Sequence, residues 1–236
     1  MARRLKDPWL SISDMMTGLM MVFLFITVSY ATVIKKESEK AVEEAVASHD
    51  DIENIVADFI DRRAEIANAL HEEFDKDLKK WDASIDDDTL TFRFESPEVL
   101  FAAGDSKVSP LFEKILSDFW PRYLDILSNN QGVISEIKIE GHTSSEWSES
   151  VGRDESYFNN MELSQNRSRN VLEYCFTQTP QQLIDWSILT ITANGFSFSR
   201  LKYDSEGRED PYASRRVEFT IMINPEESLK KISETL

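Results

Sequence analysis

One carboxylate lies within the most apolar stretch of the chain. Between Asp14 and Val28 only Thr17 and Thr27 carry polar side chains, and no other residue is charged. A carboxylate in a membrane helix costs about 2.5–3.5 kcal/mol, so its presence indicates a functional site. Thr17 follows Asp14 by three residues and therefore lies on the same helical face, where its hydroxyl can bind the carboxylate. We expect Asp14 and Thr17 to form the functional group of this segment.

Two other interpretations of Asp14 stay open. The carboxylate can lie at the level of the lipid headgroups, although Trp9 indicates that the membrane boundary lies one turn earlier. Ser11, Asp14 and Gly18 also share one helical stripe, and small residues on such a stripe allow close helix packing without any ion.

The remaining residue types exclude several other functions. The chain has 236 residues, a formal net charge of -17 and a single cysteine, Cys175. The negative charge disfavours direct binding of nucleic acid, and one cysteine forms no intrachain disulfide. The three histidines, His49, His71 and His142, are scattered, so we expect no metal site. No nucleophile or phosphate-binding motif occurs, so we expect neither an enzyme nor a bound cofactor.

The apolar run is long enough to cross a membrane. Residues 10–34 would form a helix of about 37 Å, compared with a hydrocarbon core of about 30 Å. Basic residues near the N-terminus favour a cytoplasmic location for residues 1–9 under the positive-inside rule. The alternative is a cleavable signal peptide with its site at Ser29-Tyr30-Ala31. The length of the run and the carboxylate at Asp14 favour a single-pass transmembrane helix.

A stretch without glycine or proline follows the span. Its composition favours helix, and a helix from residue 35 to 81 would be roughly 70 Å long. Apolar residues recur there at spacings of mostly four and three, which is a heptad-like stripe. They are Ile52, Val56, Phe59, Ile66, Leu70, Phe74, Leu78 and Trp81. We interpret residues 35–86 as a helical stalk that forms a parallel coiled coil; the alternative is an amphipathic helix folded onto the C-terminal domain.

The rest of the chain predicts an α+β domain at residues 87–228 with a tail at 229–236. Four strands are expected, at 89–94, 133–139, 188–192 and 216–223, and apolar and polar residues alternate in the first of them. Two helices are expected at 110–127 and 161–177, the first capped by Ser109 and kinked or broken at Pro121. This βαβαββ order predicts a sandwich of one sheet with helices on one face.

The residues around Asp14 resemble a known membrane family. The run Asp14-Met-Met-Thr-Gly18-Leu-Met-Met-Val-Phe-Leu is similar to the single span of the flagellar stator protein MotB and, more distantly, of ExbD and TolR. The leader from Asp7 to Ser13 is more similar to the ZorB family of Zorya anti-phage defence systems. The resemblance implies that Asp14 carries an ion, a proton rather than sodium. It also implies a homodimer inside a ring of a MotA-like (ZorA-type) multi-span protein.

The C-terminal part resembles the OmpA-like peptidoglycan-binding family. The matching residues are Gly141-His142-Thr143, the stretch from Asn160 to Val171, and Arg215-Arg216-Val217-Glu218-Phe219. The resemblance implies that Asn160, Leu163 and Arg167 bind the diaminopimelate side chain of a stem peptide. These three positions share one helical face, and a guanidinium can bind a carboxylate through two hydrogen bonds. The alternative is an ion pair between Arg167 and one of the chain's own acids.

One position departs from the OmpA-like pattern. The family has an acid after Gly-His-Thr that meets the ammonium group of the ligand, whereas this chain has Ser144. Either an acid of the following loop replaces it or the ligand differs; the candidates are Glu146, Glu149, Asp154 and Glu155. We expect His142 to be structural.

Together these features predict a peptidoglycan-anchored stator subunit of an ion-driven motor in anti-phage defence. We expect a single-pass protein of the bacterial inner membrane, with a cytoplasmic N-terminus and a periplasmic C-terminal domain. The alternatives are a flagellar MotB-type stator and a purely structural wall tether without ion flux.

Overall fold

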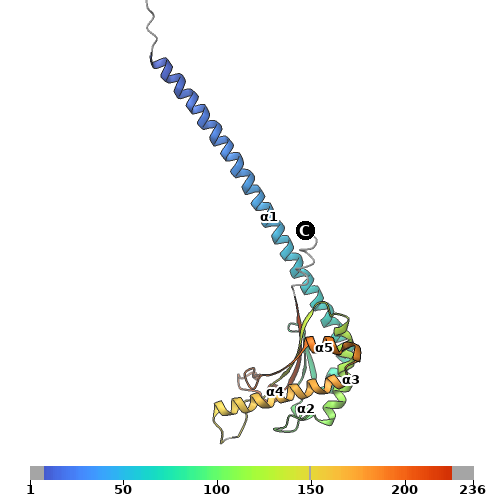
Figure 1. The fold of residues 1–236 in the computed structure, drawn as a ribbon. Coiled ribbons are helices and arrows are strands. Elements are labelled where there is room, and N and C mark those ends of the chain that lie inside the picture. Colours follow the sequence, from blue (N-terminus) through green and yellow to red (C-terminus); the bar gives the residue numbers. More distant parts are fainter. Residues whose placement is uncertain (1–7, 149, 225–236) are drawn as a thin grey trace, which may run out of the picture. The chain divides into compact units, whose positions relative to one another are not determined.

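A computed structural model describes residues 8–148 and 150–224, without the side chains of residues 8–14, 41, 43–51, 97 and 98. The chain divides into two compact units, residues 1–54 and 55–236. One continuous helix, α1 (Pro8–Trp81), contributes residues to both units (Figure 1). The expected tail at 229–236 and most of the expected N-terminal segment at 1–9 lie outside the described residues.

The N-terminal unit contains an apolar helix. Within α1, Met15–Lys40 is long and apolar enough to cross a membrane. Large side chains such as Phe23 and Phe25 are exposed in the isolated chain, so this part of α1 needs lipid or a partner helix around it. The hydroxyls of Thr27 and Thr32 donate 2.7 Å hydrogen bonds to the carbonyls of Phe23 and Ser29, which satisfies them in an apolar environment. The expected N-terminal apolar helix is confirmed.

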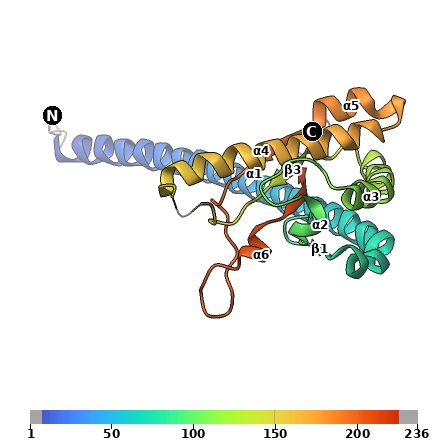
Figure 2. The same cartoon turned by 90° about the horizontal axis from the view of Figure 1, so that it is seen from below.

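The C-terminal unit is built on one mixed sheet in the strand order β1-β2-β5-β3-β4. The strands are β1 (Ala83–Asp86), β2 (Thr91–Phe94), β3 (Ile134–Gly141), β4 (Ile191–Gly195) and β5 (Val217–Ile223). The helices after α1 are α2 (Pro97–Leu100), α3 (Pro110–Ser128), α4 (Arg153–Thr177), α5 (Ile184–Thr190) and α6 (Pro211–Ser214), with a 3-10 turn at Gln181–Leu183. Strands β3 and β4 are parallel, and their connection carries α4 and α5, as a parallel crossover requires. The expected α+β fold class is confirmed, and Figure 2 shows α3 and α4 on one side of the sheet.

An aromatic core joins the helices to the sheet. The ring centroid of Phe119 in α3 lies 4.7 Å from that of Phe92, 5.1 Å from that of Phe219 and 5.3 Å from that of Phe74. Phe74 belongs to α1, and Leu70 and Trp81 of the same helix are also buried in this core. The last turns of α1 are therefore part of the C-terminal domain.

The heptad-like stripe of α1 thus divides. Leu70, Phe74 and Trp81 pack on the domain, as in the alternative interpretation of the stalk, whereas Ile52 and Val56 are exposed. The structural boundary at residue 54 differs from the expected one at residue 86, because the aromatic side chains at the end of the helix find their partners in the sheet and in α3.

Three local expectations need comment. The Ser109 cap is confirmed, since its hydroxyl oxygen accepts a 3.0 Å hydrogen bond from the Phe112 N–H. Of the kink or break expected at Pro121, the break does not occur: α3 continues through Pro121, because the flanking Trp120 and Tyr123 are buried and stabilise the helix by packing. The expected strand at 188–192 is largely helical, since α5 extends to Thr190 and β4 begins at Ile191.

Candidate ligand-binding pocket

Helix α4 rests directly on the ends of two strands. A Cβ atom added to Gly141 of β3 would lie 2.4 Å from the Ser164 carbonyl oxygen, and one added to Gly195 of β4 would lie 2.4 Å from the Gln165 backbone nitrogen. Neither contact leaves room for a side chain, so glycine at both strand ends permits this approach. A 2.9 Å hydrogen bond from the Ser197 N–H to Ser164 Oγ holds the helix there. The docking brings the N-terminal half of α4 beside the loop that follows β3.

The three site residues predicted on α4 line one pocket of about 600 Å³. Asn160, Leu163 and Arg167 contribute side chains from the same helical face. The other walls come from residues 101–104, from the loop after β3, and from Arg215 just before β5. Four segments far apart in the sequence therefore meet at the pocket.

Arg167 is held in this pocket by the backbone of the 101–105 loop. Its Nε donates a 2.8 Å hydrogen bond to the Asp105 carbonyl and its Nη2 a 3.4 Å bond to the Ala102 carbonyl. The guanidinium also lies over the Phe101 ring, 4.8 Å from the centroid. Burial, with a smaller effect of the Arg215 charge, lowers the pKa of Arg167 to about 10, so the group stays protonated at neutral pH. Within the described part of the chain its hydrogen-bond partners are carbonyls rather than carboxylates.

Glu146 brings a carboxylate next to Ser144. Its Oε2 accepts hydrogen bonds from Arg215 Nη1 at 2.7 Å and from Ser144 Oγ at 3.4 Å. Of the four acids considered in the sequence, Glu146 lines the pocket. Asp154 and Glu155 lie in the first turn of α4 and do not line this pocket, and Glu149 lies outside the described residues.

Two polar groups in the pocket are buried and lack a hydrogen-bond partner among the described residues. They are Asn160 Nδ2 and Thr143 Oγ1, on side chains that are 2% and 3% exposed. An unpaired buried polar group costs about 1–3 kcal/mol, so both would be stabilised by a polar ligand. With two guanidiniums, one carboxylate and an unpaired amide, the pocket is complementary to a ligand that carries both a carboxylate and an ammonium group.

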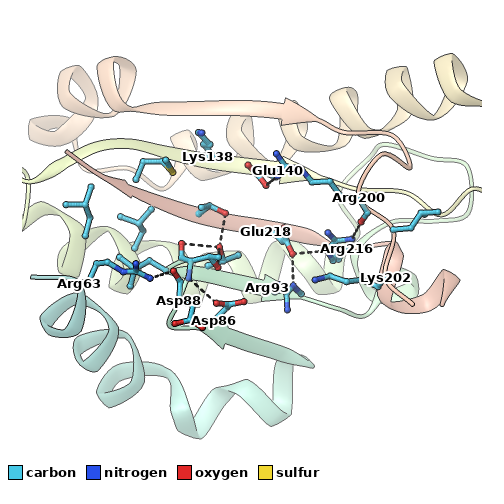
Figure 3. A pocket seen from close by; sticks show the side chains of 18 of the residues that line it. Arg63, Asp86, Asp88, Arg93, Lys138, Glu140, Arg200, Lys202, Arg216 and Glu218 are labelled. Carbon is cyan, nitrogen blue, oxygen red and sulfur yellow. Dashed lines mark hydrogen bonds and ion pairs between the residues drawn. The ribbon is translucent and has the colours of Figure 1, made fainter. Parts of the chain in front are cut away.

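A second pocket of about 650 Å³ lies on the other face of the sheet (Figure 3). Glu218 accepts hydrogen bonds there from Arg93 Nε at 2.6 Å and from Arg216 Nε at 2.8 Å, and its Oε2 lies 3.1 Å from His142 Nε2. Burial alone would raise the pKa of Glu218, but the contact with His142 and the charge of Arg216 hold this pKa well below its usual range.

Next to this second pocket lies a cluster that the sequence did not predict, and two of its members, Glu140 and Glu218, line the pocket. Glu140, His142 and Glu218 bring three ligand atoms within 4.8 Å of one another, as a metal site would. The carboxylates of Glu140 and Glu218 are already paired with arginines. Arg200 donates a 3.0 Å hydrogen bond to Glu140, and Arg93 and Arg216 donate to Glu218. We therefore assign the cluster a structural role, which agrees with the role expected for His142. Its members lie on two strands and a loop, so their spacing in sequence gave no metal signature.

The predicted ion-carrying residues lie in the other unit. The backbone of Asp14 belongs to α1, but its side chain lies outside the described residues. Thr17 is described and exposed. In the C-terminal unit, sequence reasoning missed Arg215 and Trp147 as pocket residues, whereas Glu146 was one of the four candidate acids. Arg215 was visible only as part of a motif, and Trp147 carried no periodic signal.

Comparisons with known proteins give a relative that spans nearly the whole chain. No protein-family model matches the sequence. The Zorya protein ZorB of Escherichia coli (Crooks strain) is 45% identical over 231 residues, which cover 96% of this chain and 92% of that protein. A solved MotB-like protein from Desulfovibrio vulgaris shares the fold, with a TM-score of 0.50 and 23% identity over 71% of this chain and 95% of that one. The cell wall anchor of a type VI secretion system from Pseudomonas aeruginosa has a TM-score of 0.44 and 21% identity, over 67% and 97% of the two chains.

Proposed function

The chain belongs to the ZorB family of Zorya proteins, and from this we propose that it is the wall-anchored B subunit of an ion-driven membrane complex in anti-phage defence. The apolar N-terminal helix and the MotB-like fold of the C-terminal domain support this proposal. The chain itself is not an enzyme. The 45% sequence identity between this chain and a ZorB protein favours a role in defence over a role in flagellar propulsion.

The proposed location is the bacterial inner membrane. One helix, residues 10–34, crosses it, the N-terminus stays in the cytoplasm, and the C-terminal domain is in the periplasm. The basic residues that precede the span support this orientation. Two copies pair inside a ring of a MotA-like, ZorA-type multi-span protein.

The proposed wall contact is the pocket on α4. The observation that carries it is that Asn160, Leu163 and Arg167 line one pocket together with Glu146. In this assignment Arg167 and the unpaired amide of Asn160 bind a carboxylate of a diaminopimelate side chain. Glu146 takes the ammonium group, in place of the acid that the OmpA-like pattern has at position 144.

Sedimentation with purified peptidoglycan tests this assignment. We expect Arg167→Ala in the detergent-solubilised chain to reduce co-sedimentation at least tenfold, because a charge-assisted hydrogen bond contributes about 1.5–3 kcal/mol. Arg169→Ala is the matched control, since Arg169 lies on the same helix but is exposed and outside the pocket. Because Arg167 also holds the 101–105 loop, circular dichroism must show that the variant is folded. Undiminished sedimentation of a folded Arg167→Ala variant would overturn the assignment.

The proposed ion carrier is Asp14, with Thr17 as its hydrogen-bond partner. Protonation of Asp14 removes its charge and lets the partner ring move past it, while the wall anchor prevents the pair from rotating. A low dielectric around the carboxylate favours its neutral form, which makes reversible proton transfer feasible near neutral pH. We propose a proton rather than sodium as the ion.

The rival function, a purely structural wall tether, makes the opposite prediction for one substitution. In cells that carry the complete defence system, Asp14→Asn should abolish protection against phage at normal protein levels. Asp7→Asn, outside the apolar run, should retain protection. Full protection in cells that carry the Asp14→Asn variant would contradict the ion-carrier proposal and favour the structural tether.

A further inference from the structure

One aromatic side chain at the candidate pocket has no described partner. Trp147 lines the pocket and remains 41% exposed. It makes no ring contact or hydrogen bond with the described residues. Exposed indole surface is unfavourable in water, and tryptophan is enriched where proteins bind other molecules. Trp147 is therefore a candidate contact residue.

The segment that carries Trp147 is held beside the pocket by contacts of its neighbours. The adjacent Glu146 is bound by Arg215 at 2.7 Å, and the backbone N–H of Ser145 donates to Glu209 at 2.8 Å. The Thr143 N–H donates to the Ser197 carbonyl at 3.0 Å. A side chain presented by such a restrained segment loses little conformational entropy on binding.

Trp147 and Arg167 lie in one pocket, so a single ligand molecule can contact both. Both residues line the same volume of about 600 Å³. In peptidoglycan, a stem-peptide residue held at Arg167 lies within two or three residues of the sugar that carries the peptide, which is about 11 Å of extended chain at most. A sugar ring of the same molecule therefore lies within reach of Trp147.

We propose that Trp147 binds the glycan strand of peptidoglycan by stacking its indole ring on an N-acetylhexosamine beside the bound stem peptide. The electron-rich indole face attracts the C–H groups of a sugar ring, and an exposed tryptophan offers a large rigid surface for this contact. The exposed hydroxyl of Ser148 at the same pocket offers a hydrogen bond to a sugar substituent. This inference rests on the proposed peptidoglycan binding and adds a second recognition element to the same site.

Two ligands that differ only in the sugar test the inference. The probes are the disaccharide–tetrapeptide released from peptidoglycan by a muramidase and the sugar-free tetrapeptide with an acetylated N-terminus, so that no additional ammonium group is introduced. Calorimetry with the full-length chain in detergent compares wild type, Trp147→Ala and Trp147→Phe. Phe158→Ala is the matched control, because Phe158 is 69% exposed but lies outside the pocket.

We expect wild type to bind the disaccharide–tetrapeptide roughly five- to tenfold more tightly than the free peptide, which is the range expected for one aromatic contact. Trp147→Ala should abolish this difference without weakening the free peptide, Trp147→Phe should retain part of it, and Phe158→Ala should leave it unchanged. An equal effect of Trp147→Ala on both ligands, or no effect on either, would overturn the glycan contact while leaving the proposed wall binding intact. Absence of binding of both ligands to wild type would overturn the proposed wall binding and this inference together.

Discussion

Arg215 and Arg216 are neighbours in the sequence but act on opposite faces of the sheet. Arg215 lines the pocket beside α4, where it binds Glu146, whereas Arg216 binds Glu218 on the other face (Figure 3). Successive side chains of extended backbone point to opposite sides, so Arg215 reaches the pocket while Arg216 reaches the other face of the sheet. The pocket and the buried ion network are therefore held by the same turn of chain.

The arginines around Glu140 and Glu218 offset the repulsion between two carboxylates that the strand register places opposite each other. Glu140 of β3 and Glu218 of β5 are directly paired, and like charges placed opposite each other destabilise a sheet. Arg93 is paired with Glu218 from the other side, and Arg200 binds Glu140. The arginines make this row of buried charges stable.

The depressed pKa of Glu218 predicts a stability that depends on pH. A folded-state pKa below the ordinary value of 4.5 means that ionised Glu218 stabilises the fold above about pH 4.5. This contribution is lost as the pH falls from there toward the folded-state pKa. We expect Glu218→Gln to lower the free energy of unfolding by about 3 kcal/mol at pH 7, because two largely buried arginines lose their partner, and to weaken the acid dependence.

Denaturant unfolding of the full-length chain between pH 3 and pH 7 measures both effects. The exposed Glu162 provides the control, since Glu162→Gln should leave stability and acid dependence nearly unchanged. An unaltered acid dependence in Glu218→Gln would contradict the role of this carboxylate.

At the scale of elements, α1 combines two kinds of apolar surface. Its Met15–Lys40 part exposes apolar side chains and is able to span a membrane, whereas its last turns bury theirs in the domain core. The first part is apolar on all sides, whereas the second carries an apolar stripe among charged residues. The difference comes from the partners that each part finds.

Leu70 tests whether the end of α1 belongs to the folded domain. Leu70 is fully buried, so Leu70→Ala should lower the free energy of unfolding by about 3 kcal/mol through lost burial and an internal cavity. Ile60 on the same helix is 57% exposed, so Ile60→Ala should change it by about 0.5 kcal/mol or less. Thermal or denaturant unfolding compares the two variants, and equal losses would mean that the helix end is not part of the core.

At the scale of the whole molecule, pairing of two chains is the central proposal. In a parallel coiled coil, identical stripe positions lie next to each other on the two chains. Ile52→Cys should therefore form a disulfide-linked dimer in membranes under mild oxidation. Asn54→Cys, which points to the opposite side of the helix, should form much less.

The native cysteine does not interfere with this experiment, because Cys175 is buried. Gel electrophoresis without reductant measures the dimer. Equal cross-linking at positions 52 and 54, or none at either, would contradict a parallel pair at this stripe.

The sequence by itself determined the features that depend on local periodicity and local caps. These are the apolar helix, the Ser109 cap, the α+β order of elements, and the shared helical face of Asn160, Leu163 and Arg167. Each follows from residues within a few turns of one another, so neighbouring side chains suffice to predict it.

Only the tertiary structure decided which distant groups meet. It brought Glu146 and Trp147 to the pocket, gathered Glu140, His142 and Glu218 on the other face, and placed the end of α1 in the core. An apolar or polar pattern shows which face of an element needs a partner, but not which partner covers it. That choice is made by packing and charge between segments far apart in the chain, where the glycines at 141 and 195 let α4 dock against the sheet.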